Sequence, residues 1–316
     1  MSTTQAWIDA TRDMLLSGYV EELDVLTGAI SSTSQTTITV QGVASSWAKG
    51  VVFEVNSEMF YVTGVAGGNT LSVFRGYGGS TATTHANSDL VRVSPKFPTY
   101  RIIQSLNDDL NDLSSPDNGL FQMKTTSFDY NASVDGYNLA GLTSDEINSI
   151  YSVTYADVGV EATEPEITSW TLKRNRDTTT FSSGLALILY TPAWPGKKVT
   201  VMYKSPLTPV STTDLTTNQS ATGLAPTAYD LPPLGAAMAL MTTTPIRREF
   251  LDAEGTSRMA DEVPPGAISA SFRDLMGRRR ARLEAESARL LARYPQVWSR
   301  NSAVRPTSQW SGFSDG

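Results

Sequence analysis

Hydrophobic and polar positions along the chain change period several times, and these changes divide it into segments. The first apolar residues follow helical spacing, which predicts a helix from Trp7 to Leu16 that ends before Gly18. From Glu21 to Val93 the period becomes two, as in short strands joined by compact turns. The strands expected there are Thr37–Val40, Val51–Val55, Met59–Thr63 and Thr70–Phe74. Several short strands at such intervals indicate a small barrel or a sandwich.

A second helix and a second β-rich stretch are expected next. Apolar residues between Pro98 and Leu113 recur at helical spacing, and a first helical turn accepts the proline. The stretch from Leu120 to about Ser205 favours a sandwich. Its expected strands are Leu120–Thr126, Ile150–Val158, Ile167–Arg174, Leu185–Tyr190 and Lys198–Tyr203. Residues 206–227 are rich in Thr, Ser and Pro and predict a linker or extended arm.

Two more helices are expected towards the C-terminus, one from Leu231 to about Phe250 and an arginine-rich one from Ile268 to Arg293. The expected fold class is therefore α+β, with a helical-bundle core of about four helices, two inserted antiparallel β-modules (a small barrel and a sandwich) and an extended C-terminal tail. The expected domains are a helical core at 1–20, 98–115 and 228–294, an inserted β-module at 21–97, a second β-rich domain at 118–205, a linker at 206–227 and a docking tail at 295–316.

Composition and charge narrow the class of protein. Of the 316 residues, 40% are apolar and 18% charged, which is ordinary for a folded chain. Cysteine is absent, so disulfides and thiolate zinc sites are excluded. No apolar run reaches the roughly 20 residues of a membrane span, and the polar N-terminus lacks a signal-peptide pattern. We expect a protein made in the cytoplasm, with no membrane partner.

The net charge of −7 is unevenly distributed. Residues 273–305 hold nine arginines against three acidic residues, a net +6, so the rest of the chain carries −13. An acidic body with a basic arm indicates an interaction segment rather than a uniform nucleic-acid binder.

Candidate catalytic residues are few. His85 is the only histidine, so neither a nucleophilic triad nor a common zinc site can form in the usual way, and a structural or solvent-exposed role in a polar loop is expected. The pairs Asp108-Asp109 and Asp145-Glu146 could serve a two-carboxylate glycosidase, but a capping box from Thr143 to Glu146 explains the second pair more simply. The glycines at 76–79 lack the Lys-Ser/Thr ending of a phosphate-binding loop. No enzyme activity, cofactor or metal is expected.

Two C-terminal features indicate contacts with partners. The arginine cluster can contact another subunit or a portal, can be a solvated helix face, or can touch DNA; arginine favours bidentate pairing with carboxylates. Aromatic residues in the polar tail are either interface anchors, or pack back on the same subunit, or are disordered. The residues expected to make portal or subunit contacts are Arg278, Arg279, Arg280, Arg282, Tyr294, Trp298, Arg300, Arg305, Trp310 and Phe313.

The segment Val73–His85 (VFRGYGGSTATTH) carries a family resemblance. It resembles a phrase common in virion proteins of tailed bacteriophages, where such a hairpin closes a small β-module and is followed by a valine strand and a helix. Leu90–Val93 and the helix after Pro98 continue the pattern here, and residues 263–295 look loosely like the C-terminal part of head-to-tail adaptors. The hairpin residues that match are Arg75, Gly76, Tyr77, Gly78, Gly79 and His85.

The resemblance implies a structural subunit of the phage neck, a head-to-tail connector or adaptor located in the virion. It implies a homo-oligomeric ring, commonly of twelve subunits, that binds the portal protein above and tail, stopper or nozzle proteins below. Double-stranded DNA would pass through the ring without sequence-specific binding, and an acidic wall would let phosphates slide. The alternatives are another tail or baseplate structural protein, which shares the hairpin, and a glycan-binding or glycan-degrading tail protein.

Overall fold

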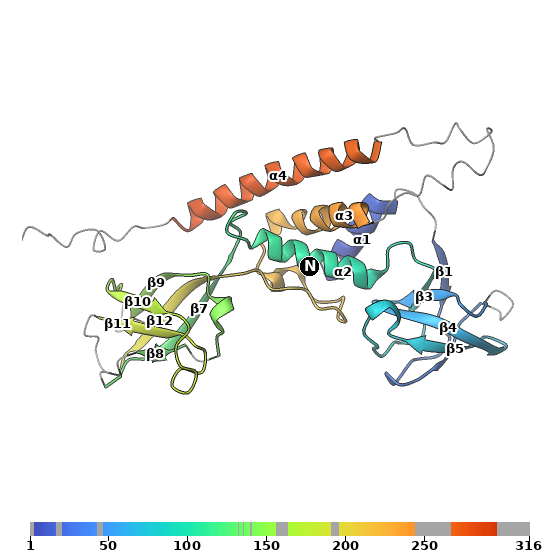
Figure 1. Cartoon of the computed structure of the whole chain (residues 1–316), viewed down its shortest axis with the longest axis horizontal. Helices are drawn as coiled ribbons and strands as arrows, with labels where there is room; N and C mark the ends of the chain where they lie inside the picture. Colours follow the sequence, from blue (N-terminus) through green and yellow to red (C-terminus); the bar gives the residue numbers. More distant parts are fainter. Residues whose placement is uncertain are drawn as a thin grey trace, which may run out of the picture. The chain divides into compact units, whose positions relative to one another are not determined.

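The computed structural model describes residues 3–16, 21–42, 47–131, 133–134, 136–139, 141–155, 164–190, 196–243 and 267–295. The chain divides into two compact units. The first unit is made of Met1–Gly119 and Leu207–Glu286, and the second of Leu120–Pro206 and Ser287–Gly316. Figure 1 labels their helices and strands.

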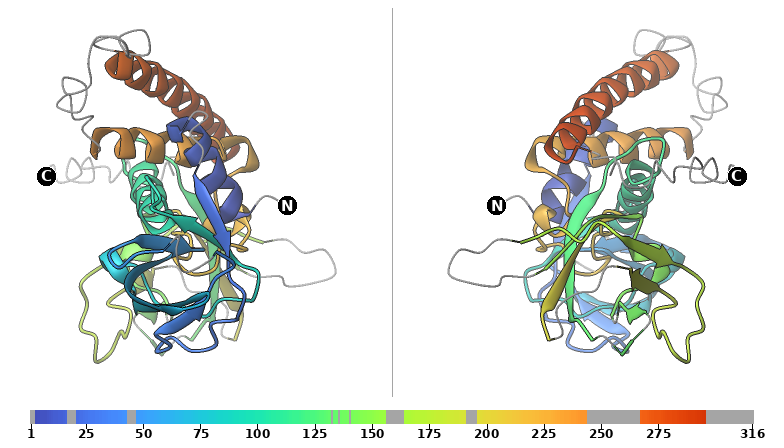
Figure 2. Two further views of the ribbon diagram at one scale, coloured as in Figure 1. Left: turned by 90° about the vertical axis from the view of Figure 1, so that its right-hand side faces the viewer. Right: turned by 90° about the vertical axis from the view of Figure 1, so that its left-hand side faces the viewer.

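A six-stranded antiparallel sheet forms the β-part of the first unit, in the order β1-β6-β3-β4-β5-β2. Its two outer strands are joined by further hydrogen bonds, from Thr27 N to Thr39 O at 3.0 Å and from Gln41 N to Val25 O at 2.8 Å. The sheet therefore closes into a barrel, whose blue and cyan strands face the viewer on the left of Figure 2. The strands are β1 (Glu22–Val25), β2 (Thr37–Thr39), β3 (Val52–Val55), β4 (Glu58–Gly67), β5 (Thr70–Arg75) and β6 (Leu90–Val93).

The interior of this barrel is filled by alternate residues of its strands. Phe53 of β3 and Phe60 of β4 are fully buried, and their rings stack with centroids 4.9 Å apart. Trp47 packs edge-on against Phe53 at 5.2 Å. The period-two pattern correctly predicted β2, β3, β4 and β5, although successive residues are buried on both faces of β3 and at the start of β4.

The α-helices are α1 (Thr4–Leu16), α2 (Thr99–Leu113), α3 (Leu231–Thr243) and α4 (Ala267–Arg293). Helix α3 packs on both α1 and α2. Residues 206–227, where a linker was expected, hold the short 3-10 helix η4 (Gln219–Thr222) and the start of η5 (Pro226–Ala228). They also bond to the helices, since Val210 N donates to the Asn107 side chain at 2.8 Å and Thr4 N donates to Thr217 O at 2.9 Å.

The second unit contains two three-stranded antiparallel sheets, in the orders β7-β12-β9 and β10-β11-β8. Residues of both sheets share one hydrophobic core, for example Val153 and Val201 of the first with Leu187 and Tyr137 of the second. The strands are β7 (Gln122–Asp129), β8 (Tyr137–Asn138), β9 (Ser149–Tyr155), β10 (Trp170–Lys173), β11 (Ala186–Leu189) and β12 (Lys198–Ser205). The capping box from Thr143 to Glu146 is confirmed at the 3-10 helix η3 (Ser144–Glu146).

The prediction of an α+β protein built on a helical-bundle core is wrong. The described residues form twelve strands in three sheets and only four α-helices, so the protein is mostly β. Helical periodicity shows which face of a helix is buried but not what covers it. Here Thr99 at the start of α2 bonds a barrel residue, Glu54, and α4 has only one apolar side chain, Leu283, buried among those described.

None of the helices in the described part of the chain combines the length and the apolar run that a bilayer crossing needs.

Replacing Phe60 with Ala should destabilise the barrel by about 3–5 kcal/mol, because it removes a fully buried ring and leaves a cavity. The control is Phe74→Ala, since this side chain is 59% exposed on the same barrel, and it should change stability by less than about 0.5 kcal/mol. Urea unfolding followed by circular dichroism measures both. Equal effects would contradict the assignment of Phe60 to the core.

Candidate functional site

The family-like segment begins at the end of β5 and turns back over the barrel. Three of its glycines have positive φ, +61° at Gly76, +67° at Gly78 and +90° at Gly79. A Cβ on Gly78 would also lie 2.9 Å from the hydroxyl of Tyr100. Only glycine combines this backbone geometry with this close approach, so these glycines shape the 3-10 turn η2 (Tyr77–Gly79) rather than bind a phosphate.

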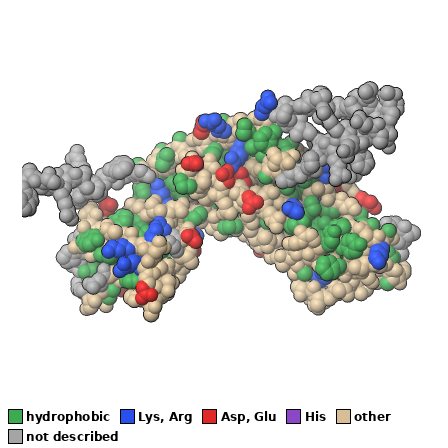
Figure 3. Space-filling view, viewed as in Figure 1, with side chains coloured by type: hydrophobic (Ala, Val, Ile, Leu, Met, Phe, Trp, Pro, Cys, Tyr) green, Lys and Arg blue, Asp and Glu red, His purple; other side chains and the backbone are tan. Residues whose placement is uncertain are grey.

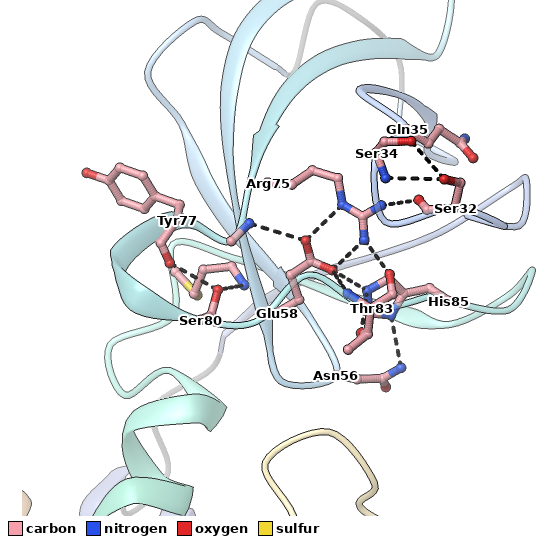
Figure 4. A network of polar contacts seen from close by, with 12 residues as sticks. Ser32, Ser34, Gln35, Asn56, Glu58, Arg75, Tyr77, Ser80, Thr83 and His85 are labelled. Atoms are coloured by element: carbon pink, nitrogen blue, oxygen red, sulfur yellow. Dashed lines mark hydrogen bonds and ion pairs between the residues drawn. The ribbon is translucent and has the colours of Figure 1, made fainter.

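A fully buried carboxylate, Glu58, lies at the centre of this segment (Figure 4). Arg75 donates to it through two nitrogens, from Nε to Oε1 at 2.8 Å and from Nη2 to Oε2 at 2.6 Å. The backbone of Gly76 donates at 3.3 Å and that of Thr83 at 2.9 Å. His85 Nε2 lies 2.9 Å from Oε2. The matching residues of the motif, 75, 76 and 85, are thus brought together by Glu58.

His85 is buried, with 4% of its surface exposed, so of the two expected roles the structural one is confirmed and the solvent-exposed one is wrong. Its Nδ1 lies 3.3 Å from Asn56 Nδ2, an amide nitrogen that also donates to Asp89 at 3.0 Å. The Asn56 amide can donate to Nδ1, and Glu58 can accept a hydrogen bond from Nε2. Both contacts suit the tautomer of His85 that carries its proton on Nε2. Arg75 also donates to the carbonyls of Ser32 and Thr83. The histidine therefore belongs to a network that holds loops together.

Burial would raise the pKa of Glu58, but hydrogen bonds from His85 and Arg75 outweigh it and hold this pKa below its usual value. The carboxylate therefore stays ionised and fully bonded, and the network can fix the loop geometry of the barrel. We call it the Glu58 clasp.

A second buried carboxylate joins the barrel to the helices. Glu54 of β3 is 1% exposed and accepts from Arg12 of α1 at 2.6 Å. It also accepts from the backbone of Thr99, at the start of α2, at 2.7 Å and from its hydroxyl at 2.9 Å. Burial raises the pKa of Glu54, although Arg12 and Thr99 act against the rise. Arg92 lies 3.6 Å away on β6.

Sequence reasoning missed both glutamates. Each is a charged residue directly beside a buried apolar one, in Phe53-Glu54-Val55 and in Glu58-Met59-Phe60. A charge that interrupts an apolar strand is a usable signal, because a buried carboxylate needs partners.

The predicted arginine cluster on α4 makes contacts inside the first unit. Arg279 Nη2 lies 2.6 Å from Asp109 and 2.7 Å from Asp112, both on α2. Arg282 Nε lies 2.8 Å from Asp230, and its guanidinium also donates to the carbonyl of Thr227.

Of the remaining contact residues predicted from the sequence, three are described by the structure and five are not. Arg280 pairs with Glu284 on the same helix and is 81% exposed, and Arg278 is exposed. The ring of Tyr294 packs against two rings of the second unit, with its centroid 6.2 Å from that of Phe121 and 5.9 Å from that of Tyr151. The others lie outside the described residues: Trp298, Arg300, Arg305, Trp310 and Phe313.

Asp109 is the most perturbed carboxylate in this region. It is 7% exposed, and a Cβ on Gly235 of α3 would lie 1.6 Å from its Oδ1, so the glycine makes room for it. Burial raises its pKa to about 7, against the attraction of Arg279. The two pairs Asp108-Asp109 and Asp145-Glu146 therefore occupy a helix contact and a capping box.

The described residues include no group of three or more His, Asp or Glu side chains placed to hold a metal ion. No family model matches the chain, and no curated protein matches its sequence.

Glu58→Gln should destabilise the barrel by about 3–5 kcal/mol at pH 7, because it leaves the buried charge of Arg75 unpaired. The stabilisation from Glu58 is present above the ordinary carboxyl pKa and is lost as the pH falls through its lowered value, so the variant should lose less stability on acidification. Urea unfolding at pH 7 and pH 3.5 tests this. The matched control is Glu22→Gln, at an exposed position of the same barrel.

Asp109→Asn should stabilise the protein at pH 8, because the amide still accepts from Arg279 without a buried charge. The folded state keeps a proton on Asp109 up to a pKa of about 7, so wild-type stability falls as the pH rises from about 4 to 7. The slope is at most about 1.4 kcal/mol per pH unit. The difference between variant and wild type should vanish near pH 4. Asp108→Asn, at an exposed position of α2, is the control; a less stable Asp109→Asn at pH 8 contradicts the prediction.

Proposed function

We propose that the protein is a structural, non-enzymatic subunit of the neck of a tailed-phage virion. In this proposal it forms a ring, of about twelve copies, that joins the portal of the DNA-filled head to the tail and forms part of the DNA channel. The resemblance of the segment Val73–His85 to virion proteins carries the proposal. No cofactor takes part, and DNA passes without sequence-specific contacts.

The Glu58 clasp supports this use of the resemblance. Arg75, Gly76 and His85, which carry the similarity, all bond one buried carboxylate, and Gly78 is required by the turn. The motif residues therefore hold a loop of the small barrel in place around one buried carboxylate. This arrangement requires several of the residues at once. A pattern of this kind is more specific than a matching run of glycines.

Exposed surface on α4 is a second support. Met276 is 49% exposed and Leu291 is 46% exposed, and Arg280, four residues after Met276, has a side chain that is 81% exposed. A long helix with apolar and arginine side chains on its open face suits contacts between subunits, where such residues are enriched. In a ring these contacts are heterologous and must close.

One observation favours a second candidate, a glycan-binding tail or baseplate protein. Phe74 is 59% exposed and Tyr77 is 40% exposed on the barrel, and the Tyr77 ring lies 5.4 Å from that of Tyr61. Exposed aromatic rings on a β-surface are the feature expected of such a module. Trp47 is buried and Trp170 half-buried, while Trp194 lies outside the described residues. A glycan-binding screen that finds a ligand lost in Phe74→Ala would favour this candidate.

The connector function predicts that the full-length chain co-purifies with a portal ring and forms a ring beneath it in electron micrographs. The double variant Trp298→Ala, Trp310→Ala should stay folded but weaken the association at least tenfold, because aromatic anchors dominate such interfaces. Association is measured by pull-down against salt-matched wild type.

The matched control is Trp47→Phe, which keeps an aromatic ring in the buried core of the barrel and should leave the association unchanged. Unchanged binding by the double tail variant would refute the role of the tail as an anchor. A full-length protein that neither binds a portal nor assembles would refute the connector function itself.

A further inference from the structure

Helix α4 is attached to the rest of the first unit mainly by charged contacts. Arg279 bonds Asp109 and Asp112, and Arg282 bonds Asp230. Among the described side chains of α4, Leu283 is the only buried apolar one. Figure 3 shows basic and acidic side chains close together over the helices on this face. A helix held in this way depends on matching charges more than on a shared apolar core.

The surface that receives α4 is built for these arginines. It consists of Asp109 and Asp112 on α2 together with Thr227 and Asp230 before α3, and we call it the acidic docking surface. Gly235 is part of its construction, since any side chain there would collide with Asp109. Arg279 reaches both carboxylates through one nitrogen, Nη2, at 2.6 Å from Asp109 and 2.7 Å from Asp112.

The covalent chain does not dictate which copy of α4 occupies this surface. Helix α3 ends at Thr243 and α4 begins at Ala267, so 23 residues separate them in sequence. That length of chain can extend at most about 80 Å. The α4 helix of a second copy offers the same arginines and the same Leu283, so every contact made within one chain can also form between two chains.

We propose that in the assembled protein the acidic docking surface of each copy holds α4 of a neighbouring copy. The exchange rests on the proposed ring and names the contact that joins its subunits. Each copy donates one helix and accepts one, a heterologous contact that closes in a ring with no surface left over. Helix α4, with seven arginines against three acidic residues, then lies on the acidic docking surface of the next copy, and the ring is held by opposite charges.

The effective concentration of a neighbour's helix selects between the two arrangements, because the contacts themselves are identical. In a dilute monomer α4 occupies its own docking surface. In a ring the neighbour's helix competes on equal contacts, and the exchange also links the copies. Exchanged elements of this kind are a low-cost route to assembly.

Cross-linking between introduced cysteines distinguishes exchange from docking within one chain. The chain has no cysteine of its own, so only the introduced thiols can react. Thr227 Oγ1 lies 3.0 Å from Glu286 Oε2, and replacing both with Cys leaves the contacts of Arg279 intact. The full-length Thr227→Cys, Glu286→Cys variant, assembled as checked by electron microscopy, is treated with a short bis-maleimide. Exchange predicts a ladder of covalent oligomers on a denaturing gel, whereas the dilute monomer should give only an internally linked chain.

Mixing single variants tests the same point independently. A mixed assembly of Thr227→Cys copies and Glu286→Cys copies should give cross-linked dimers that contain one of each, and neither variant alone should. Using Arg280→Cys in place of Glu286→Cys is the matched control, because that side chain points to solvent and should yield at least tenfold less dimer. If Glu286→Cys does not fold, Asp230→Cys with Arg282→Cys replaces the pair.

Two results would overturn the exchange, and they differ in what they say of the proposed function. An assembled ring in which the double variant forms only internal links refutes the exchange and leaves the ring subunit intact. A full-length chain that never assembles, alone or with a portal ring, refutes both. Adding Arg279→Ala to the double variant should lower the yield of cross-linked oligomers at least tenfold. An unchanged yield would show that the Arg279 contact does not hold the exchanged helix.

Discussion

The bond between Glu54 and its partners is the constraint on which the first unit depends. A carboxyl group with 1% of its surface exposed is stable only if nearby groups replace the water it has lost. Its partners come from different elements, Arg12 from α1 and the backbone of Thr99 from the start of α2. Separating the barrel from either helix would leave Glu54 buried without one of its hydrogen-bond partners. The N-terminus of α2 adds the favourable end of the helix dipole.

The Glu58 clasp applies the same principle four residues later, on the other side of the β3–β4 turn. There the partners are Arg75 at the end of β5, and the backbone of Thr83 and the side chain of His85 from the segment that follows. The two carboxylates flank the turn between β3 and β4. Glu54, before the turn, binds the helices, and Glu58, after the turn, binds the loop that follows β5. A motif that looks like a run of turn residues is thereby explained by one buried charge.

Arginine serves two purposes in this protein. Arg12 and Arg75 are buried and neutralise carboxylates that organise the fold. The arginines of α4 lie nearer the surface, where ion pairs are weaker and screened by salt. Arg279 is intermediate, since it pairs with both a buried and an exposed aspartate, and Asp109 has a pKa raised to about 7 by burial. This gradation separates contacts that fix the fold from contacts that can exchange between copies.

The sequence by itself determined the local elements, because period and turn chemistry depend on neighbours in the chain. It located β2 to β5, α2 and the capping box at Thr143 to Glu146, and it marked the segment Arg75–His85. The tertiary structure alone decided what each buried face packs against. It replaced the expected helical bundle with a mostly β protein and buried His85 beside Glu58. It also paired Arg279 with residues 170 and 167 positions away. Such contacts have no periodic signature, since a charge chooses its partner by distance in space.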